Sequence, residues 1–96
     1  MDLITVDFET YYDREFSLSK MTTEEYVRDP RFEVIGVGVK VNNNTTEWAS
    51  GSKQQIRDFL HTFDWDGAMF LAHNTVFDGA IANWLFDITP RVYTDT

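Results

Sequence analysis

Residues 68–93 read AMFLAHNTVFDGAIANWLFDITPRVY, and their pattern is that of a strand, a helix and a second strand. The first five residues are all apolar, which is typical of a strand covered on both faces. Asn74 is suited to cap a helix over 75–86, where the apolar residues recur at helical spacing. A strand at 90–93 follows. This βαβ unit predicts two parallel strands joined by a helix.

The residues on either side of this unit complete the expected elements. By composition and spacing, these are strands at 3–9, 32–41 and 45–49, helices at 22–28 and 53–63, a loop at 11–20, and a helix cap at 94–96. Gly36 and Gly38 alternate with branched residues and suggest a close neighbouring backbone. Three successive strands followed by a βαβ unit predict an α/β fold, with a mixed sheet that is antiparallel on one side and parallel on the other.

The composition indicates one small domain. The chain has 96 residues, of which 43% are hydrophobic, with 8 Phe, 4 Tyr and 3 Trp, and these values exclude intrinsic disorder. No apolar run approaches the roughly 20 residues of a membrane span, and the first residues do not resemble a signal peptide. The absence of Cys excludes a disulfide scaffold and a Cys-ligated zinc, and it fits a cytoplasmic protein.

The charge balance limits the classes of function that are compatible with the sequence. With 16 Asp+Glu against 8 Lys+Arg, the net charge is −8. Such a chain is a poor generic nucleic-acid coat, because affinity for phosphates comes mainly from Lys and Arg. It remains compatible with an enzyme that holds divalent cations between its carboxylates and an anionic substrate.

Asp7 and Glu9 are the first candidate functional residues. Because side chains alternate along a strand, both project from one face, about 7 Å apart along the backbone. Two neighbouring carboxylates repel each other unless a cation lies between them, and hard oxygen ligands favour Mg²⁺ or Mn²⁺. The alternative is a strand that ends at the surface with both acids solvated.

Asp78 is the second candidate, and it lies one helical turn after Asn74 on the same side of the expected helix. This turn follows the strand at 68–72, and α/β sheets usually bind ligands at the ends of such strands. The alternative is a simple Asn cap followed by an exposed helical Asp.

Together the two segments resemble a family. Residues 6–10, Val-Asp-Phe-Glu-Thr, resemble the first motif of the DEDD, or DnaQ-like, 3′–5′ exonucleases. Residues 72–78, Ala-His-Asn-Thr-Val-Phe-Asp, resemble the second motif with its Asn-x-x-Phe-Asp core, at a similar separation. The sequences of residues 7–11 and 93–96 most resemble those of the proofreading domains of bacterial and phage family A DNA polymerases.

The resemblance implies an RNase H-like fold and hydrolysis of the 3′-terminal phosphodiester of single-stranded DNA, with RNA as a possible substrate. It implies a two-metal site of Mg²⁺ or Mn²⁺ in a bacterial or phage-infected cell, and partnership with the rest of an exonuclease and polymerase chain. The implied roles are catalytic metal ligation by Asp7, Glu9 and Asp78 and substrate binding by Thr10, Asn74 and Phe77.

One part of the family pattern is absent. A third motif, His-x-x-x-Asp or Tyr-x-x-x-Asp on a later helix, does not occur in these 96 residues, although Asp95 could reach the site from a strand end. Residues 1–96 are therefore expected to be the N-terminal part of one exonuclease domain whose C-terminal helices are missing. Two alternatives stay open, a catalytically inactive RNase H-like binding or assembly module and an RNA-directed nuclease of the same family.

Overall fold

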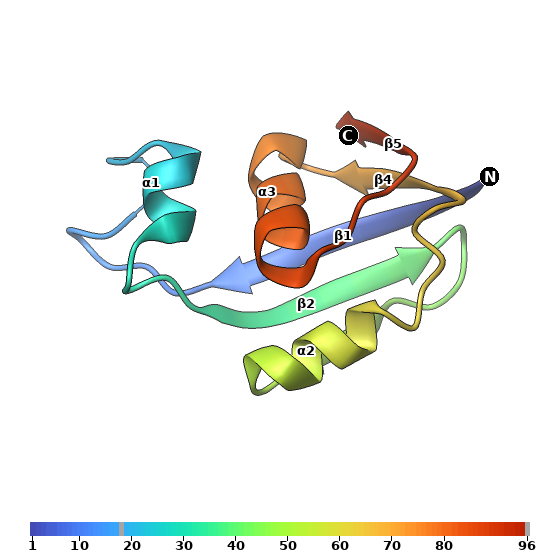
Figure 1. Cartoon of the computed structure of the whole chain (residues 1–96), viewed down its shortest axis with the longest axis horizontal. Helices are drawn as coiled ribbons and strands as arrows, with labels where there is room; N and C mark the ends of the chain where they lie inside the picture. The colour runs from blue at the N-terminus through green and yellow to red at the C-terminus, as the bar shows by residue number, and fades with distance from the viewer. Residues whose placement is uncertain (18, 96) are drawn as a thin grey trace.

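The computed structural model describes residues 1–17 and 19–95, and Figure 1 shows their helices and strands in the predicted order. The strands are β1 (Asp2–Thr10), β2 (Val34–Val41), β3 (Glu47–Ser50), β4 (Ala68–Ala72) and β5 (Val92–Asp95). The helices are α1 (Thr23–Arg28), α2 (Lys53–Leu60) and α3 (Thr75–Phe86).

The strands form one mixed sheet in the order β3-β2-β1-β4-β5. The pairs β1–β2 and β2–β3 are antiparallel, whereas β1–β4 and β4–β5 are parallel. The predicted α/β class and the division of the sheet are therefore confirmed. The central strand β1 pairs with β2 as far as Thr10, but with β4 only from Asp2 to Thr5. Among the described residues, the second half of β1 thus has no strand on its β4 side.

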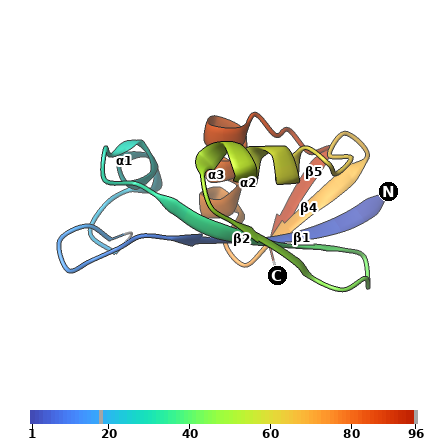
Figure 2. The ribbon, with the colours of Figure 1, turned by 90° about the horizontal axis from the view of Figure 1, so that it is seen from below.

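The three helices lie on one side of the sheet, as Figure 2 shows. Ile4, Val6 and Phe8 alternate along β1 and are buried on that side. They join a single core with buried residues of the helices, among them Val27, Ile56 and Ile81. Helix α3 packs over β1, β4 and β5, while α2 packs over β2 and β3.

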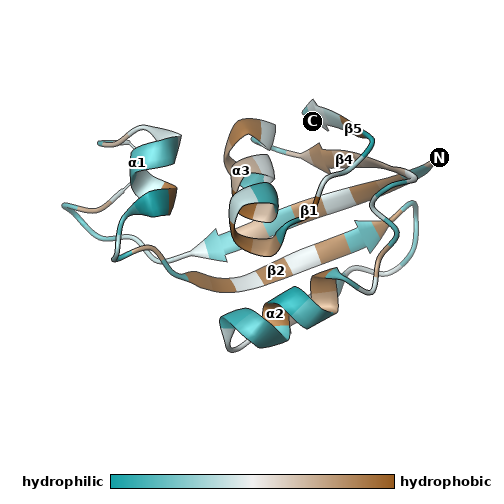
Figure 3. Cartoon of the chain, in the orientation of Figure 1, coloured by the Kyte–Doolittle hydropathy of each residue, from teal (hydrophilic) through white to brown (hydrophobic). Residues whose placement is uncertain are grey.

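The opposite side of the sheet carries no helix of the described residues (Figure 2). The prediction that residues 68–72 are covered on both faces is wrong, because Met69 and Leu71 are only partly buried while Ala68, Phe70 and Ala72 are buried. In Figure 3, β1 is brown over most of its length and teal towards its arrowhead, so the polar end of the central strand is visible along the ribbon. We call this uncovered side the open face.

The helix starts follow the sequence closely. Thr22 and Glu25 form a reciprocal capping box at α1, and Ser52 and Gln55 form one at α2. Asn74 caps α3 as expected. Each start depends on hydrogen bonds within four residues, so the local sequence specifies it.

The other boundaries shift by a few residues. Helix α2 ends at Leu60 instead of residue 63, because Thr62 and Phe63 donate to carbonyls three residues back and tighten the chain into a turn. Strand β2 begins at residue 34, since the Phe32 N–H is used in a turn to Asp29. Strand β3 covers 47–50 instead of 45–49. Strand β5 covers 92–95, so the cap expected at 94–96 is wrong for Thr94 and Asp95, and Thr96 lies outside the described residues.

The glycines of β2 have an aromatic neighbour. A Cβ atom on Gly36 would lie 2.3 Å from Cζ2 of Trp48 and 2.9 Å from the carbonyl oxygen of Ala49. The close neighbour expected here is therefore the Trp48 indole first, and the adjacent backbone second. Any side chain at residue 36 would displace the indole.

Candidate active site

Asp78 is a buried carboxylate in the first turn of α3. Its side chain is 5% exposed, and Oδ1 accepts a hydrogen bond of 3.2 Å from the Phe8 N–H of β1. This N–H lies beyond the last β1–β4 pair, at Thr5 and Leu71, in the part of β1 that no strand of the described residues pairs with on the β4 side. Asp78 thus satisfies a backbone donor that would otherwise be buried without a partner, and it ties α3 to the central strand. The alternative of an exposed helical Asp is wrong.

Asp7 lies close enough to Asp78 for their charges to interact. Burial, reinforced by the negative charge of Asp7, raises the pKa of the Asp78 carboxyl from its usual 3.8 to about 6, while the hydrogen bond from Phe8 opposes the rise. Asp7 itself is exposed on the open face. The structure therefore brings together two of the three acids predicted from the sequence, although 71 positions separate them in the chain (78 − 7).

Glu9 lies two residues further along β1 and is exposed on the same face as Asp7. Within residues 1–17 and 19–95, no three His, Cys, Asp or Glu side chains come together as a group that could hold a metal ion. The donors present are a close pair of carboxylates, which suit Mg²⁺ or Mn²⁺ in type but make up only part of an oxygen ligand set. The carboxylates thus match a divalent cation in ligand type, but they supply only some of the ligands that it needs.

Two of the three residues predicted to bind substrate contact Tyr26, a residue that the sequence did not single out, and the third contacts one of those two. The Thr10 hydroxyl lies 3.0 Å from the Tyr26 hydroxyl, and the Phe77 ring lies 5.9 Å from the Tyr26 ring. Asn74 Oδ1 accepts the Phe77 N–H at 3.3 Å. Tyr26 is 2% exposed and joins α1 to the end of β1 and the start of α3. Its role requires three distant segments to meet, so no local pattern could reveal it.

Asp95 has a structural role beside the site. Its carboxylate accepts hydrogen bonds from the N–H of Thr75, at 2.7 Å, and from the Thr75 hydroxyl, and both lower the pKa of Asp95. Strand β5 pairs Asp95 with Ala72, which places it at the start of α3. Electrostatic interaction with the nearby His73 lowers the pKa of both Asp78 and Asp95. Asp95 therefore anchors the turn that carries Asp78.

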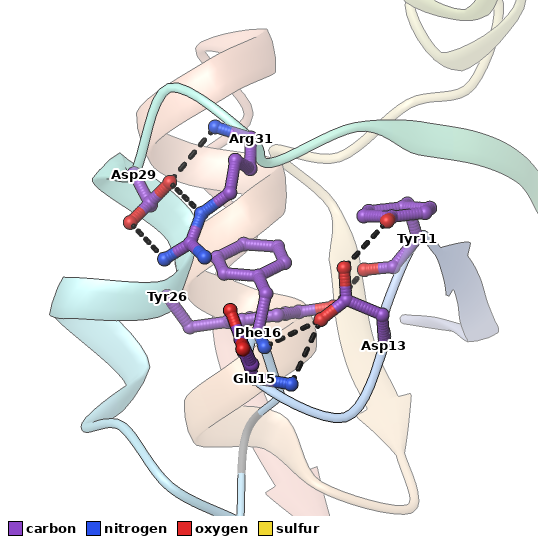
Figure 4. Close-up of polar contacts among 7 residues, drawn as sticks. All are labelled: Tyr11, Asp13, Glu15, Phe16, Tyr26, Asp29 and Arg31. Carbon is purple, nitrogen blue, oxygen red and sulfur yellow. Dashed lines mark hydrogen bonds and ion pairs between the residues drawn. The ribbon is translucent and has the colours of Figure 1, made fainter.

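The loop after β1 is built around Phe16, which is fully buried, and Figure 4 shows its contacts. The Asp13 carboxylate accepts the Phe16 N–H at 2.7 Å and the Tyr11 hydroxyl at 2.6 Å. The Phe16 ring stacks on Tyr26 with centroids 4.5 Å apart, and the Arg31 guanidinium lies 4.5 Å from its centroid. A loop held in this way gives Thr10, at the end of β1, a defined position.

The titration of Asp78 leads to a pH prediction. Between pH 3.8 and about 6 the folded chain keeps a proton that the unfolded chain loses, so this contribution to stability is present at low pH and lost as the pH rises through 6. In EDTA, Asp78→Asn is expected to raise the free energy of unfolding relative to wild type by on the order of 1 kcal/mol at pH 7, and by little at pH 4. Urea denaturation of both proteins across this range measures the difference, and a difference independent of pH would contradict it.

Asp7 and Glu9 lie on an open surface, whereas Asp78 is buried beside β1. Two hollows of about 390 Å³ are lined, respectively, by residues that include Val27, Phe32 and Leu85 and by residues that include Val76, Trp84 and Tyr93, and neither is lined by Asp7, Glu9 or Asp78. A ligand of these carboxylates would therefore approach across the sheet surface.

Comparison with known proteins identifies no relative: no protein-family model, no curated protein and no solved structure matches the chain. In the part of the chain that the structure describes, no helix is both long enough and apolar enough to cross a lipid bilayer.

Proposed function

We propose that the chain is the N-terminal part of a metal-dependent 3′–5′ exonuclease domain with an RNase H-like fold, of the proofreading type found in phage-type DNA polymerases. The substrate would be the 3′ end of single-stranded DNA, and the reaction would be hydrolysis of its terminal phosphodiester. The proposal includes the rest of an exonuclease and polymerase chain as partner and a bacterial or phage-infected cell as location.

One observation carries the proposal. The charges of the acid of the strand motif, Asp7, and the acid of the helix motif, Asp78, interact in the second half of the central strand, where Asp78 accepts the Phe8 N–H. A pair of like charges held in this way is costly unless something compensates for it. Functional sites are where such arrangements are most often found. The mixed five-stranded sheet is compatible with the RNase H-like fold that the motifs imply.

The chain's own residues would divide the work as follows. Asp7, Glu9 and Asp78 would hold the divalent cations, with Asp78 fixed in place by β1 and Asp7 open to the substrate. Mg²⁺ or Mn²⁺, when bound, would lower the pKa of water and stabilise negative charge on the leaving oxygen. Thr10, Asn74 and Phe77 would seat the terminal nucleotide, with Thr10 and Phe77 positioned by Tyr26.

A second candidate function is an inactive binding or assembly module of the same fold. The observation that favours it is the missing third metal-ligating group among residues 1–17 and 19–95. A module of this kind would use the open face for a partner and would need no cation at Asp7. The two functions therefore differ in a measurable property, the affinity for Mn²⁺.

Digestion of a 5′-labelled single-stranded oligonucleotide tests the proposal. We expect the protein to bind Mn²⁺ and, if its ligand set is completed by Asp95 or a second subunit, to release nucleotides from the 3′ end in Mg²⁺ or Mn²⁺. Mn²⁺ binding without digestion would fit an exonuclease fragment that lacks its third motif. A folded protein that neither binds Mn²⁺ nor shortens the oligonucleotide would refute the exonuclease and support the module.

A further inference from the structure

The open face brings an aromatic ring beside the two acids of β1. Asp7 pairs with Gly38 of β2, and Gly38 pairs in turn with Trp48 of β3. Glu9 pairs with Gly36, the residue on which the indole lies. Residues paired across adjacent strands point to the same side of a sheet, so the indole and both carboxylates share the open face.

The glycines decide where the indole lies. Cζ2 and Cη2 of Trp48 occupy the space that a Cβ of Gly36 would fill, at 2.3 and 2.7 Å, and Cε3 lies 3.8 Å from the corresponding position at Gly38. The ring therefore covers β2 and lies roughly one strand spacing, about 5 Å, from the backbone of β1. Trp48 is nevertheless 55% exposed, so much of the ring remains available to a ligand.

A substrate held at Asp7 and Glu9 that extends towards β2 meets this ring. The other side of β1 is filled by Ile4, Val6 and Phe8 packed beneath the helices, so Asp7 and Glu9 are accessible from the open face. Suppose that cations link a phosphate of the ligand to these carboxylates. The rest of the ligand then extends across neighbouring strands of the same face. On the β2 side, the exposed group that it meets is the Trp48 indole.

We propose that Trp48 is a stacking platform for a base of the single-stranded nucleic acid whose 3′ end is held at Asp7 and Glu9. This inference rests on the proposed function, because it needs a phosphate at the carboxylates. A flat exposed ring next to a phosphate site matches a nucleotide, in which a planar base is joined through the sugar to the phosphate. Stacking is tolerant of sequence, since every base has a π-face.

The binding of an oligodeoxythymidylate of about ten nucleotides tests the inference. The oligonucleotide carries a 5′-fluorescein, and Ca²⁺ replaces Mg²⁺ so that it stays intact while fluorescence anisotropy gives the Kd. We expect Trp48→Leu to weaken binding about tenfold and Trp48→Phe to retain most of the affinity. The matched control is Trp84→Leu, which removes a 41% exposed tryptophan from α3 on the helix side and is expected to change the Kd less than about twofold.

A second oligonucleotide separates stacking from a structural effect. If its 3′-terminal nucleotides lack bases, wild type should bind it about tenfold more weakly, and the loss of the bases should weaken binding by Trp48→Leu clearly less than it weakens binding by wild type. Circular dichroism verifies that each variant is folded. We expect the Trp48 variants to fold because Trp48 is exposed on an edge strand.

The outcomes distinguish the two proposals. Equal affinity of wild type and Trp48→Leu, with binding still dependent on Asp7, would overturn the platform and leave the exonuclease proposal standing. The platform would also be overturned if removing the 3′-terminal bases weakened binding by Trp48→Leu as much as it weakens binding by wild type. No binding of the oligonucleotide by wild type in any divalent cation would overturn the platform, and the exonuclease proposal would also fall only if the folded protein failed to bind Mn²⁺.

Discussion

Replacing Asp7 by alanine is expected to abolish Mn²⁺ binding and any cation-dependent hydrolysis of a 3′ end, while the fold stays intact. Asp7 is exposed, so its loss leaves no cavity and no buried group without a partner. As a proposed direct ligand, Asp7 should matter more than an outer-shell partner, whose loss already costs about 10–100-fold in metal affinity. We therefore expect a loss of more than about 100-fold, measured by Mn²⁺ titration with electron paramagnetic resonance.

The control for this experiment is Asp66→Ala. Asp66 is an exposed acid in the turn before β4, so this variant changes the net charge by the same amount at a distant position. Its Mn²⁺ affinity should equal that of wild type within about twofold, because exposed charges further apart than a Debye length of about 8–10 Å are largely screened. If Asp7→Ala keeps its Mn²⁺ affinity, or if Asp66→Ala loses it equally, then Asp7 is not a metal ligand.

Replacing Phe16 by alanine is expected to have the largest effect on stability. Phe16 is fully buried, with Tyr26 stacked on it and Arg31 over its ring. A Phe→Ala change at such a position costs about 3–5 kcal/mol, because the lost transfer free energy is increased by the cavity left behind. Domains are typically stable by about 5–15 kcal/mol, so urea denaturation should show a large shift in midpoint or a chain that no longer folds.

Tyr12→Ala is the matched control for the loop. Tyr12 is 73% exposed and lies four residues before Phe16, so its removal should change the free energy of unfolding by less than about 0.5 kcal/mol. A comparable loss in both variants would mean that Phe16 does not anchor the loop. A loss confined to Phe16→Ala would show that the loop beside the acids is part of the folded core.

Much of the fold could be predicted from short-range patterns. The order of elements, the central strand ending in Asp7 and Glu9, and the caps at Thr22, Ser52 and Asn74 follow from alternation, helical spacing and hydrogen bonds within four residues. Strand and helix ends were less predictable. Helix α2, for example, stops at Leu60 although its apolar spacing continues to Phe63, because the chain tightens there into a turn.

The environment of the candidate site depended on tertiary structure. Burial, reinforced by the charge of Asp7, raises the pKa of Asp78. Asp78 is held in that buried position because β4 pairs with β1 only as far as Thr5, which leaves the Phe8 N–H for Asp78 to accept. Trp48 lies next to the acids only because β2, with its two glycines, pairs between β1 and β3. Burial, charge interaction and cross-strand contact are properties of residues far apart in the chain. Local patterns therefore predicted the candidate site residues, and the packing of β1, α3 and β3 set their surroundings.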